Sequence, residues 1–213
     1  MSDYIRRLPV YLLLDCSGSM SGEPIEAVKQ GIKALLSELK GDPQALETAC
    51  LSVITFNSTA RQISPLTELM LFKEPELTAG GDTALGGALT VLAYCIKNEV
   101  RTSTPTQKGD WKPLVFLLTD GTPTDNLDDG IEALKHVSTS NIIACAAGAN
   151  ANTNTLRKIT SNVLMMNNLT AGDLAAFFAW VSGSIKASSK SIDAKPGEAI
   201  QLPPPPQGFA IVP

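Results

Sequence analysis

Two short, uninterrupted apolar runs, residues 10–14 and residues 114–118, constrain the fold more than any other feature of the sequence. Both are far too short to span a bilayer, and both end abruptly in polar residues, close to Asp15 and Asp120. Continuous apolar strands are typical of a sheet that is buried on both faces, as parallel sheets are. We therefore expect both runs to be inner strands of a parallel sheet.

Helical patterns alternate with strand patterns along the rest of the chain. We expect helices, in which apolar residues recur three or four apart, at residues 25–39, 85–96, 131–137, 153–160 and 174–185. We expect further strands at residues 50–56, 60–63, 142–147 and 162–166. This alternation predicts an α/β fold, doubly wound, in which a mostly parallel central sheet has helices on both faces. Residues 60–63 are expected to add one short antiparallel edge strand.

The length of 213 residues suits one folded domain followed by a short tail. We place the domain at residues 1–186 and the tail at residues 187–213, which is first rich in Ser and Lys and then in Pro. Four consecutive prolines at residues 203–206 favour polyproline II and cannot join a sheet. The tail is therefore expected to be extended or disordered.

Charge and cysteine usage narrow the class of protein. The net charge is −4 and no basic cluster exceeds Arg6-Arg7, so we expect no nucleic-acid binding. The four cysteines include no Cys-x-x-Cys pair, which argues against a disulfide framework or a zinc site and fits a reducing compartment. Residues 1–9 lack the apolar core of a signal peptide. We expect a cytoplasmic protein that does not insert into membranes.

Oxygen-bearing side chains follow the predicted inner strands. Asp15, Ser17 and Ser19 alternate after the first strand, and Gly18 allows the turn that brings Ser19 towards the other two. Thr83 and Asp120 lie in two further loops at the same edge of the sheet. Taken alone, the first motif is also typical of a helix cap and turn. Together, the five side chains suit a hard divalent cation, which prefers oxygen ligands.

These motifs, in this order, resemble the von Willebrand factor A (vWA) family over about residues 5–186. The resemblance implies a Rossmann-like vWA fold with a metal-ion-dependent adhesion site. Ser17 and Ser19 would be direct ligands, Asp15 and Asp120 would act partly through water, and Thr83 would be the loop threonine. Many family members have Gly-Gly-Thr, whereas here Asp82 precedes Thr83. The register of this loop, and whether Asp82 competes for the ion, stay open on the sequence alone.

The resemblance also implies a function and partners. Mg²⁺ is the expected ion, with Mn²⁺ or Ca²⁺ as alternatives, and it would grip an Asp or Glu carboxylate of a partner protein. More narrowly, residues 6–15 and 119–125 resemble the bacterial tellurite-resistance vWA proteins of the TerY type. The partner implied is a kinase or phosphatase of the same stress-resistance module. We expect a binding module with no enzymatic activity of its own.

Two other functions remain open. One is a metal-dependent phosphohydrolase with Asp15 as nucleophile, although haloacid dehalogenase-type enzymes need a second Asp where Ser17 stands. The other is a vWA subunit of an ATP-driven, chelatase-like complex. The sequence contains no Gly-x-Ser-x-Gly elbow, phosphate loop or dinucleotide fingerprint. The remaining candidates are interpreted as helix-start or surface residues without a site: Asp125, Asp128, Asp129 and His136.

Overall fold

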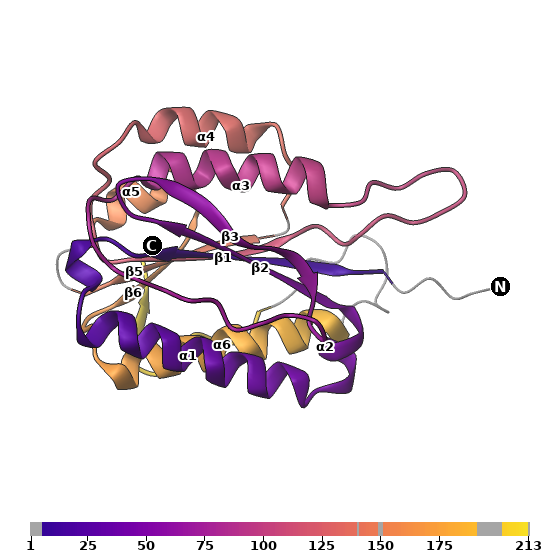
Figure 1. Cartoon of the computed structure of the whole chain (residues 1–213), viewed down its shortest axis with the longest axis horizontal. Helices are drawn as coiled ribbons and strands as arrows, with labels where there is room; N and C mark the ends of the chain where they lie inside the picture. The colour runs from indigo at the N-terminus through magenta and orange to yellow at the C-terminus, as the bar shows by residue number, and fades with distance from the viewer. Residues whose placement is uncertain (1–5, 140, 149–150, 191–201, 213) are drawn as a thin grey trace.

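The computed structural model describes residues 6–139, 141–148, 151–190 and 202–212. Its centre is a seven-stranded sheet of order β3-β2-β1-β4-β5-β6-β7 (Figure 1). The strands are β1 (Leu8–Asp15), β2 (Ala49–Phe56), β3 (Ala60–Glu68), β4 (Leu114–Thr119), β5 (Asn141–Ala147), β6 (Asn162–Met166) and β7 (Phe209–Ile211). β2, β1, β4, β5 and β6 run parallel, whereas β3 and β7 are antiparallel edges. The predicted α/β fold is confirmed, with a second antiparallel edge that the sequence did not predict.

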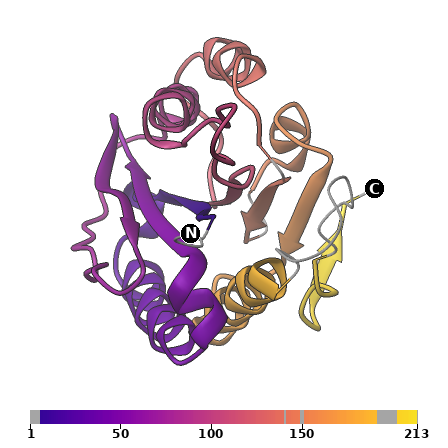
Figure 2. The same ribbon diagram turned by 90° about the vertical axis from the view of Figure 1, so that its right-hand side faces the viewer.

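Helices cover both faces of the sheet in two layers (Figure 2). Those described are α1 (Glu23–Lys40), α2 (Pro43–Thr48), α3 (Leu85–Glu99), α4 (Leu127–Lys135), α5 (Thr153–Arg157) and α6 (Ala171–Lys190), with a 3₁₀ turn η1 (Gly18–Met20). α1, α2 and α6 lie on one face, and α3, α4 and α5 lie on the other. Among the described residues, none of these helices has both the length and the apolarity to cross a membrane.

The inner strands are buried on both faces, as their uninterrupted apolar runs predict. All eight residues of β1 are buried. Leu12 and Leu14 face the core under α1 and α6, while Tyr11 and Leu13 face the core under α3. Because side chains alternate along a strand, one apolar run supplies both cores. This arrangement brings the carboxyl ends of the parallel strands to one edge, at the left of Figure 1.

Helix α2 was not predicted, because six residues are too few to show a helical period. Asp42 caps it, accepting a hydrogen bond from the Ala45 N–H at 3.0 Å, and Pro43 occupies the first turn. Strand β3 is longer than predicted and contains Pro65, which an edge strand tolerates.

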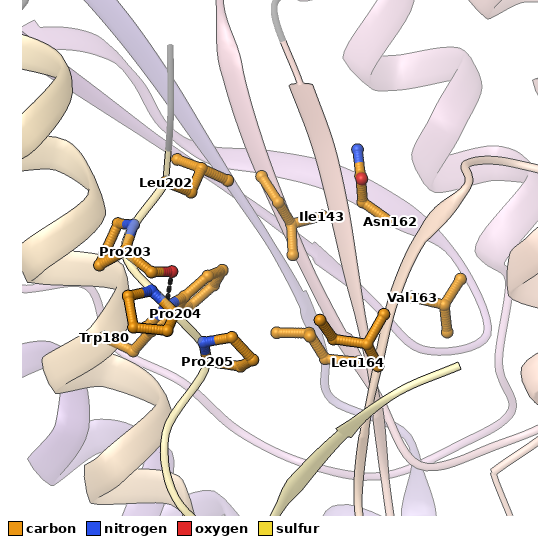
Figure 3. A pocket seen from close by; sticks show the side chains of 10 residues that line it. Ile143, Asn162, Val163, Leu164, Trp180, Leu202, Pro203, Pro204 and Pro205 are labelled. Carbon is orange, nitrogen blue, oxygen red and sulfur yellow. Dashed lines mark hydrogen bonds between the residues drawn. The ribbon is translucent and has the colours of Figure 1, made fainter. Parts of the chain in front are cut away.

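The C-terminal segment returns to the domain after α6. The indole N–H of Trp180, on α6, donates a hydrogen bond of 3.0 Å to the Pro203 carbonyl (Figure 3). Between the prolines and the sheet lies an apolar cavity of about 390 Å³, lined by Ile143 and Leu164 among others. The chain then turns at Gly208, at φ +92°, and pairs as β7 with β6.

The sequence predicted no strand in the tail. This prediction was wrong for Phe209–Ile211, which forms strand β7. The four prolines lie outside β7, and the strand begins three residues beyond them. Phe209 packs against the core under α6, which holds the strand at the edge of β6. The predicted tail also includes residues 191–201 and 213, which lie outside the described residues. The division into domain and tail stays a prediction.

Candidate metal centre

Asp15 is the last residue of β1, and its side chain is fixed on both oxygens. The residue is only 1% exposed. The Ser17 N–H donates to Oδ1 at 2.8 Å, and the Thr119 hydroxyl, at the end of β4, donates to Oδ2 at 2.5 Å. Thr119 was not predicted, although its place before Asp120 at the end of a buried strand was a signal. The carboxylate is thus held by uncharged donors from the loop after β1 and from the end of the neighbouring strand β4.

The two serines connect this carboxylate to the loop after β4. The turn of η1 brings the Ser17 and Ser19 hydroxyl oxygens within 3.1 Å of each other. The Ser19 hydroxyl donates to Asp120 Oδ1 at 2.8 Å. Four of the five predicted residues are therefore connected by hydrogen bonds: Asp15 through the Ser17 backbone, and Ser17, Ser19 and Asp120 through their side-chain oxygens.

The Gly80-Gly81 loop docks against the first loop through the backbone. The Gly18 N–H donates to the Gly81 carbonyl at 2.8 Å, and the Gly80 N–H donates to the Cys16 carbonyl at 2.9 Å. A Cβ on Gly18 would lie 3.3 Å from the Gly81 oxygen, so glycine suits this close approach. Gly81 has φ +82°, which also favours glycine.

Thr83, the fifth predicted residue, lies beside the loop after β4. It is 6% exposed, and its hydroxyl oxygen lies 3.1 Å from the position that a Cβ on Gly121 would take. Asp82 is turned away instead. Its carboxylate accepts a hydrogen bond from the exposed Ser58 hydroxyl at 3.2 Å, and its N–H donates to the same oxygen at 3.0 Å. The structure therefore places Thr83, and not Asp82, beside the Asp120 loop.

The site concentrates negative charge without a basic partner. Within the described part of the chain, neither Asp15 nor Asp120 takes part in an ion pair. Burial raises the pKa of Asp120, the Ser19 hydrogen bond opposes the rise, and the Asp15 charge adds to it. Both carboxylates would gain from a cation, because the chain itself supplies only hydroxyl and amide donors to them.

The donor set suits a hard cation. Two carboxylates and three hydroxyls are the oxygen ligands that Mg²⁺, Ca²⁺ and Mn²⁺ prefer, and no soft ligand joins them. Cys16 lies between two of these residues, but it is 2% exposed and burial raises the pKa of its thiol to about 12. No group of three or more His, Cys, Asp or Glu residues able to hold a metal occurs in the described residues. The hydroxyls are therefore essential to this set.

The other acidic candidates have structural partners. Asp125 accepts hydrogen bonds from the Gly86 and Gly87 N–H groups at the start of α3. Asn126 caps α4 by accepting from the Asp128 N–H at 3.1 Å. The His136 side chain is 77% exposed and lies 3.8 Å from Glu132. Asp125 lies at a helix start, as the sequence analysis predicted. The helix that it caps is α3, however, and not α4, which follows it in the chain.

The fold and this set of loops match a known family. A family model described as von Willebrand factor type A domain matches residues 10–178. No curated protein matches the chain. Many solved structures share the fold.

Three of these structures illustrate the likeness. A von Willebrand factor type A protein from Catenulispora acidiphila is 23% identical, with TM-score 0.62, over 86% of this chain and 43% of its own. Proximal thread matrix protein 1 from the mussel byssus, solved with zinc in its MIDAS motif, is 18% identical, with TM-score 0.59, over 84% and 48%. BatB from Bacteroides thetaiotaomicron is 17% identical, with TM-score 0.53, over 82% and 97%. The chain thus spans less than half of the first two proteins.

Proposed function

Since the chain belongs to the von Willebrand factor type A family, we propose that it is a protein-binding module that depends on a divalent cation. The cation would sit at a metal-ion-dependent adhesion site formed by Asp15, Ser17, Ser19, Thr83 and Asp120. One observation carries the proposal: two carboxylates at the ends of neighbouring strands accept hydrogen bonds from hydroxyls and have no basic partner in the described residues.

The five residues would contact the ion in two ways. The Ser17, Ser19 and Thr83 hydroxyls would contact it directly, while Asp15 and Asp120 balance its charge, partly through water. Hydroxyl and water ligands cancel little of the double charge of the ion. When bound, the ion therefore supplies a positive centre that an Asp or Glu carboxylate of a partner can neutralise.

The finer assignment rests on the ligand types and on the sequence. We propose Mg²⁺, because the set consists of oxygen ligands and has neither the Cys nor the His ligands that zinc sites usually contain. The resemblance of residues 6–15 and 119–125 to the TerY type supports a role in a bacterial tellurite- or stress-resistance system. A kinase or phosphatase of that system, in the cytoplasm, is the partner we propose.

We propose no enzymatic activity for the chain. Both oxygens of Asp15 already accept hydrogen bonds, and the residue is 1% exposed. A nucleophilic carboxylate needs a free oxygen that can approach the phosphorus atom, so this geometry weighs against the phosphohydrolase alternative. No contact in the described residues specifically favours a chelatase-like subunit.

Affinity capture on the full chain tests the proposal. The wild type should retain a partner in Mg²⁺ and release it when EDTA is added. Ser19→Ala should lose the partner, because it removes a ligand and the hydrogen bond to Asp120. Ser21→Ala is the matched control, since Ser21 is an exposed serine two residues further on. Equal retention in Mg²⁺ and EDTA, or by Ser19→Ala, would overturn the proposal.

A further inference from the structure

The loop after β4 is joined by two hydrogen bonds to the start of α3 and by two more to Thr83, which lies just before that helix. Asp125 Oδ1 accepts from the Gly86 N–H at 2.9 Å, and Oδ2 accepts from the Gly87 N–H at 2.7 Å. Beside them, the Thr83 N–H donates to the Thr124 hydroxyl at 3.1 Å, and the Thr124 N–H donates to the Thr83 carbonyl at 2.9 Å. Segments about forty residues apart are thus joined around Thr83.

Asp125 supplies the side-chain cap that the N-cap residue of α3 cannot provide. The residue at the N-cap position is Ala84, whose side chain cannot accept a hydrogen bond. The first N–H groups of a helix have no partner within it, and they carry the positive end of its dipole. The Asp125 carboxylate satisfies two of these groups and brings a negative charge to them.

Glycines allow the loop to come this close. A Cβ on Gly86 would lie 2.1 Å from the Asn126 carbonyl oxygen. A Cβ on Gly130, in α4, would lie 2.4 Å from the Gly86 oxygen. Because no side chain fits between these backbones, α3 and the loop that carries Asp125 are in direct contact and have little room to shift.

We propose that Asp125 is a positioning residue of the metal site, which holds Thr83 and Asp120 together as one unit. Thr83 precedes α3 by two residues, and Asp120 precedes Asp125 by five, so fastening the two loops fixes the separation of their oxygens. In this unit the Thr83 hydroxyl already lies next to Gly121. The inference rests on the proposed metal site and adds a residue that the ligand motifs do not contain.

A plain helix cap is the competing explanation. It would contribute to stability and nothing to metal affinity. Asp42 provides the matched control, because it caps α2 through the Ala45 N–H and belongs to none of the three loops. Asp125→Ala and Asp42→Ala should therefore lower the unfolding midpoint to a similar extent.

Calorimetric titration of the full chain with Mg²⁺ or Mn²⁺ separates the two explanations. Asp125→Ala should weaken affinity about 10- to 100-fold, the usual effect of removing a residue that orients a ligand, while Asp42→Ala leaves it unchanged. Adding Asp125→Ala to Thr83→Ala should weaken affinity no further, whereas adding it to Ser17→Ala should. Asp125→Asn, which keeps one acceptor oxygen, should recover part of the loss and serves if the alanine variant does not fold.

The outcomes are distinguishable. Wild-type affinity in Asp125→Ala, or in Asp125→Asn if only that variant folds, overturns the positioning role and leaves the metal site standing. Full additivity with Thr83→Ala overturns it too. A wild-type chain that binds neither ion overturns the proposed function and this inference together.

Discussion

The carboxylates at the two ends of β1 differ in the groups that donate hydrogen bonds to them. At the amino end, Arg7 makes a paired contact with Asp110, from Nε to Oδ1 at 3.0 Å and from Nη2 to Oδ2 at 2.5 Å. The Asp110 side chain is fully buried, and the Arg101 N–H donates to it as well. At the carboxyl end, Asp15 and Asp120 have only uncharged donors.

The difference separates a charge that is neutralised within the fold from charges that the proposed ion would neutralise. A buried carboxylate with a bidentate arginine is neutralised within the fold and needs nothing from outside. Asp15 and Asp120 each accept a hydrogen bond from a different hydroxyl and have no basic partner in the described residues, and burial raises the pKa of Asp120. A cation from solution can therefore act at one end of the strand and has no role at the other. The following predictions test this contrast.

The largest effect is expected at the amino end. Arg7→Met leaves the buried Asp110 charge without its partner and should lower the free energy of unfolding by about 3–5 kcal/mol. Urea denaturation measures this loss. The loss should be the same with Mg²⁺ and with EDTA, and a loss that Mg²⁺ reverses would contradict the structural role of this pair.

A smaller effect is expected from the ion itself. Mg²⁺ at one hundred times its dissociation constant should raise the free energy of unfolding by about 2.7 kcal/mol. Asp15→Asn should abolish this increase, and Arg7→Met should keep it. Thermal unfolding of the three proteins in Mg²⁺ and in EDTA checks the prediction. An increase that survives in Asp15→Asn would place the ion elsewhere.

The pH dependence of the metal-free chain should reflect Asp120. Its pKa is higher in the folded chain than in the unfolded chain, so the folded form holds the proton more tightly. The contribution of Asp120 to stability is full below the ordinary aspartate pKa of about 3.9, and it is lost as pH rises through the folded pKa. Asp120→Asn should remove this decline. Urea midpoints in EDTA between pH 4 and pH 7, taken as wild type minus variant, measure it.

The smallest effect is expected for Asp82. Its carboxylate bonds to Ser58 and is exposed, so Asp82→Ala should change metal affinity and stability by less than about 0.5 kcal/mol. Metal titration and urea denaturation of this variant check the prediction. A loss of affinity like that of Thr83→Ala would show that Asp82 faces the ion as well and would contradict the prediction.

The sequence predicted most of the sheet because its inner strands are apolar on both faces. A short apolar run such as residues 10–14 is compatible with few structures other than a buried strand. It also predicted that Asp15, Thr83 and Asp120 come together, since each follows a strand or opens a helix at the same edge. Thr119 was missed because its bond to Asp15 depends on β1 and β4 being neighbours. That adjacency is not visible in the order of the chain.

The role of Asp125 was missed for a related reason. An acidic run before a helix is typical of the cap of that helix, and nothing local says that one member crosses to α3. The contact depends on Gly86 and Gly130 letting two backbones meet, which is a tertiary effect. β7 was missed because three residues after a proline run show no alternation.

The return of the C-terminal segment matters for anyone who shortens this chain. The family model stops at residue 178, inside α6 and two residues before Trp180. A fragment cut there would lack both the indole that binds Pro203 and the strand that pairs with β6. The backbone of β6 would then be an exposed sheet edge, close to Ile143. Exposed edges of this kind pair with strands from other molecules. Such a fragment should be prone to self-association, even though every proposed metal ligand is present.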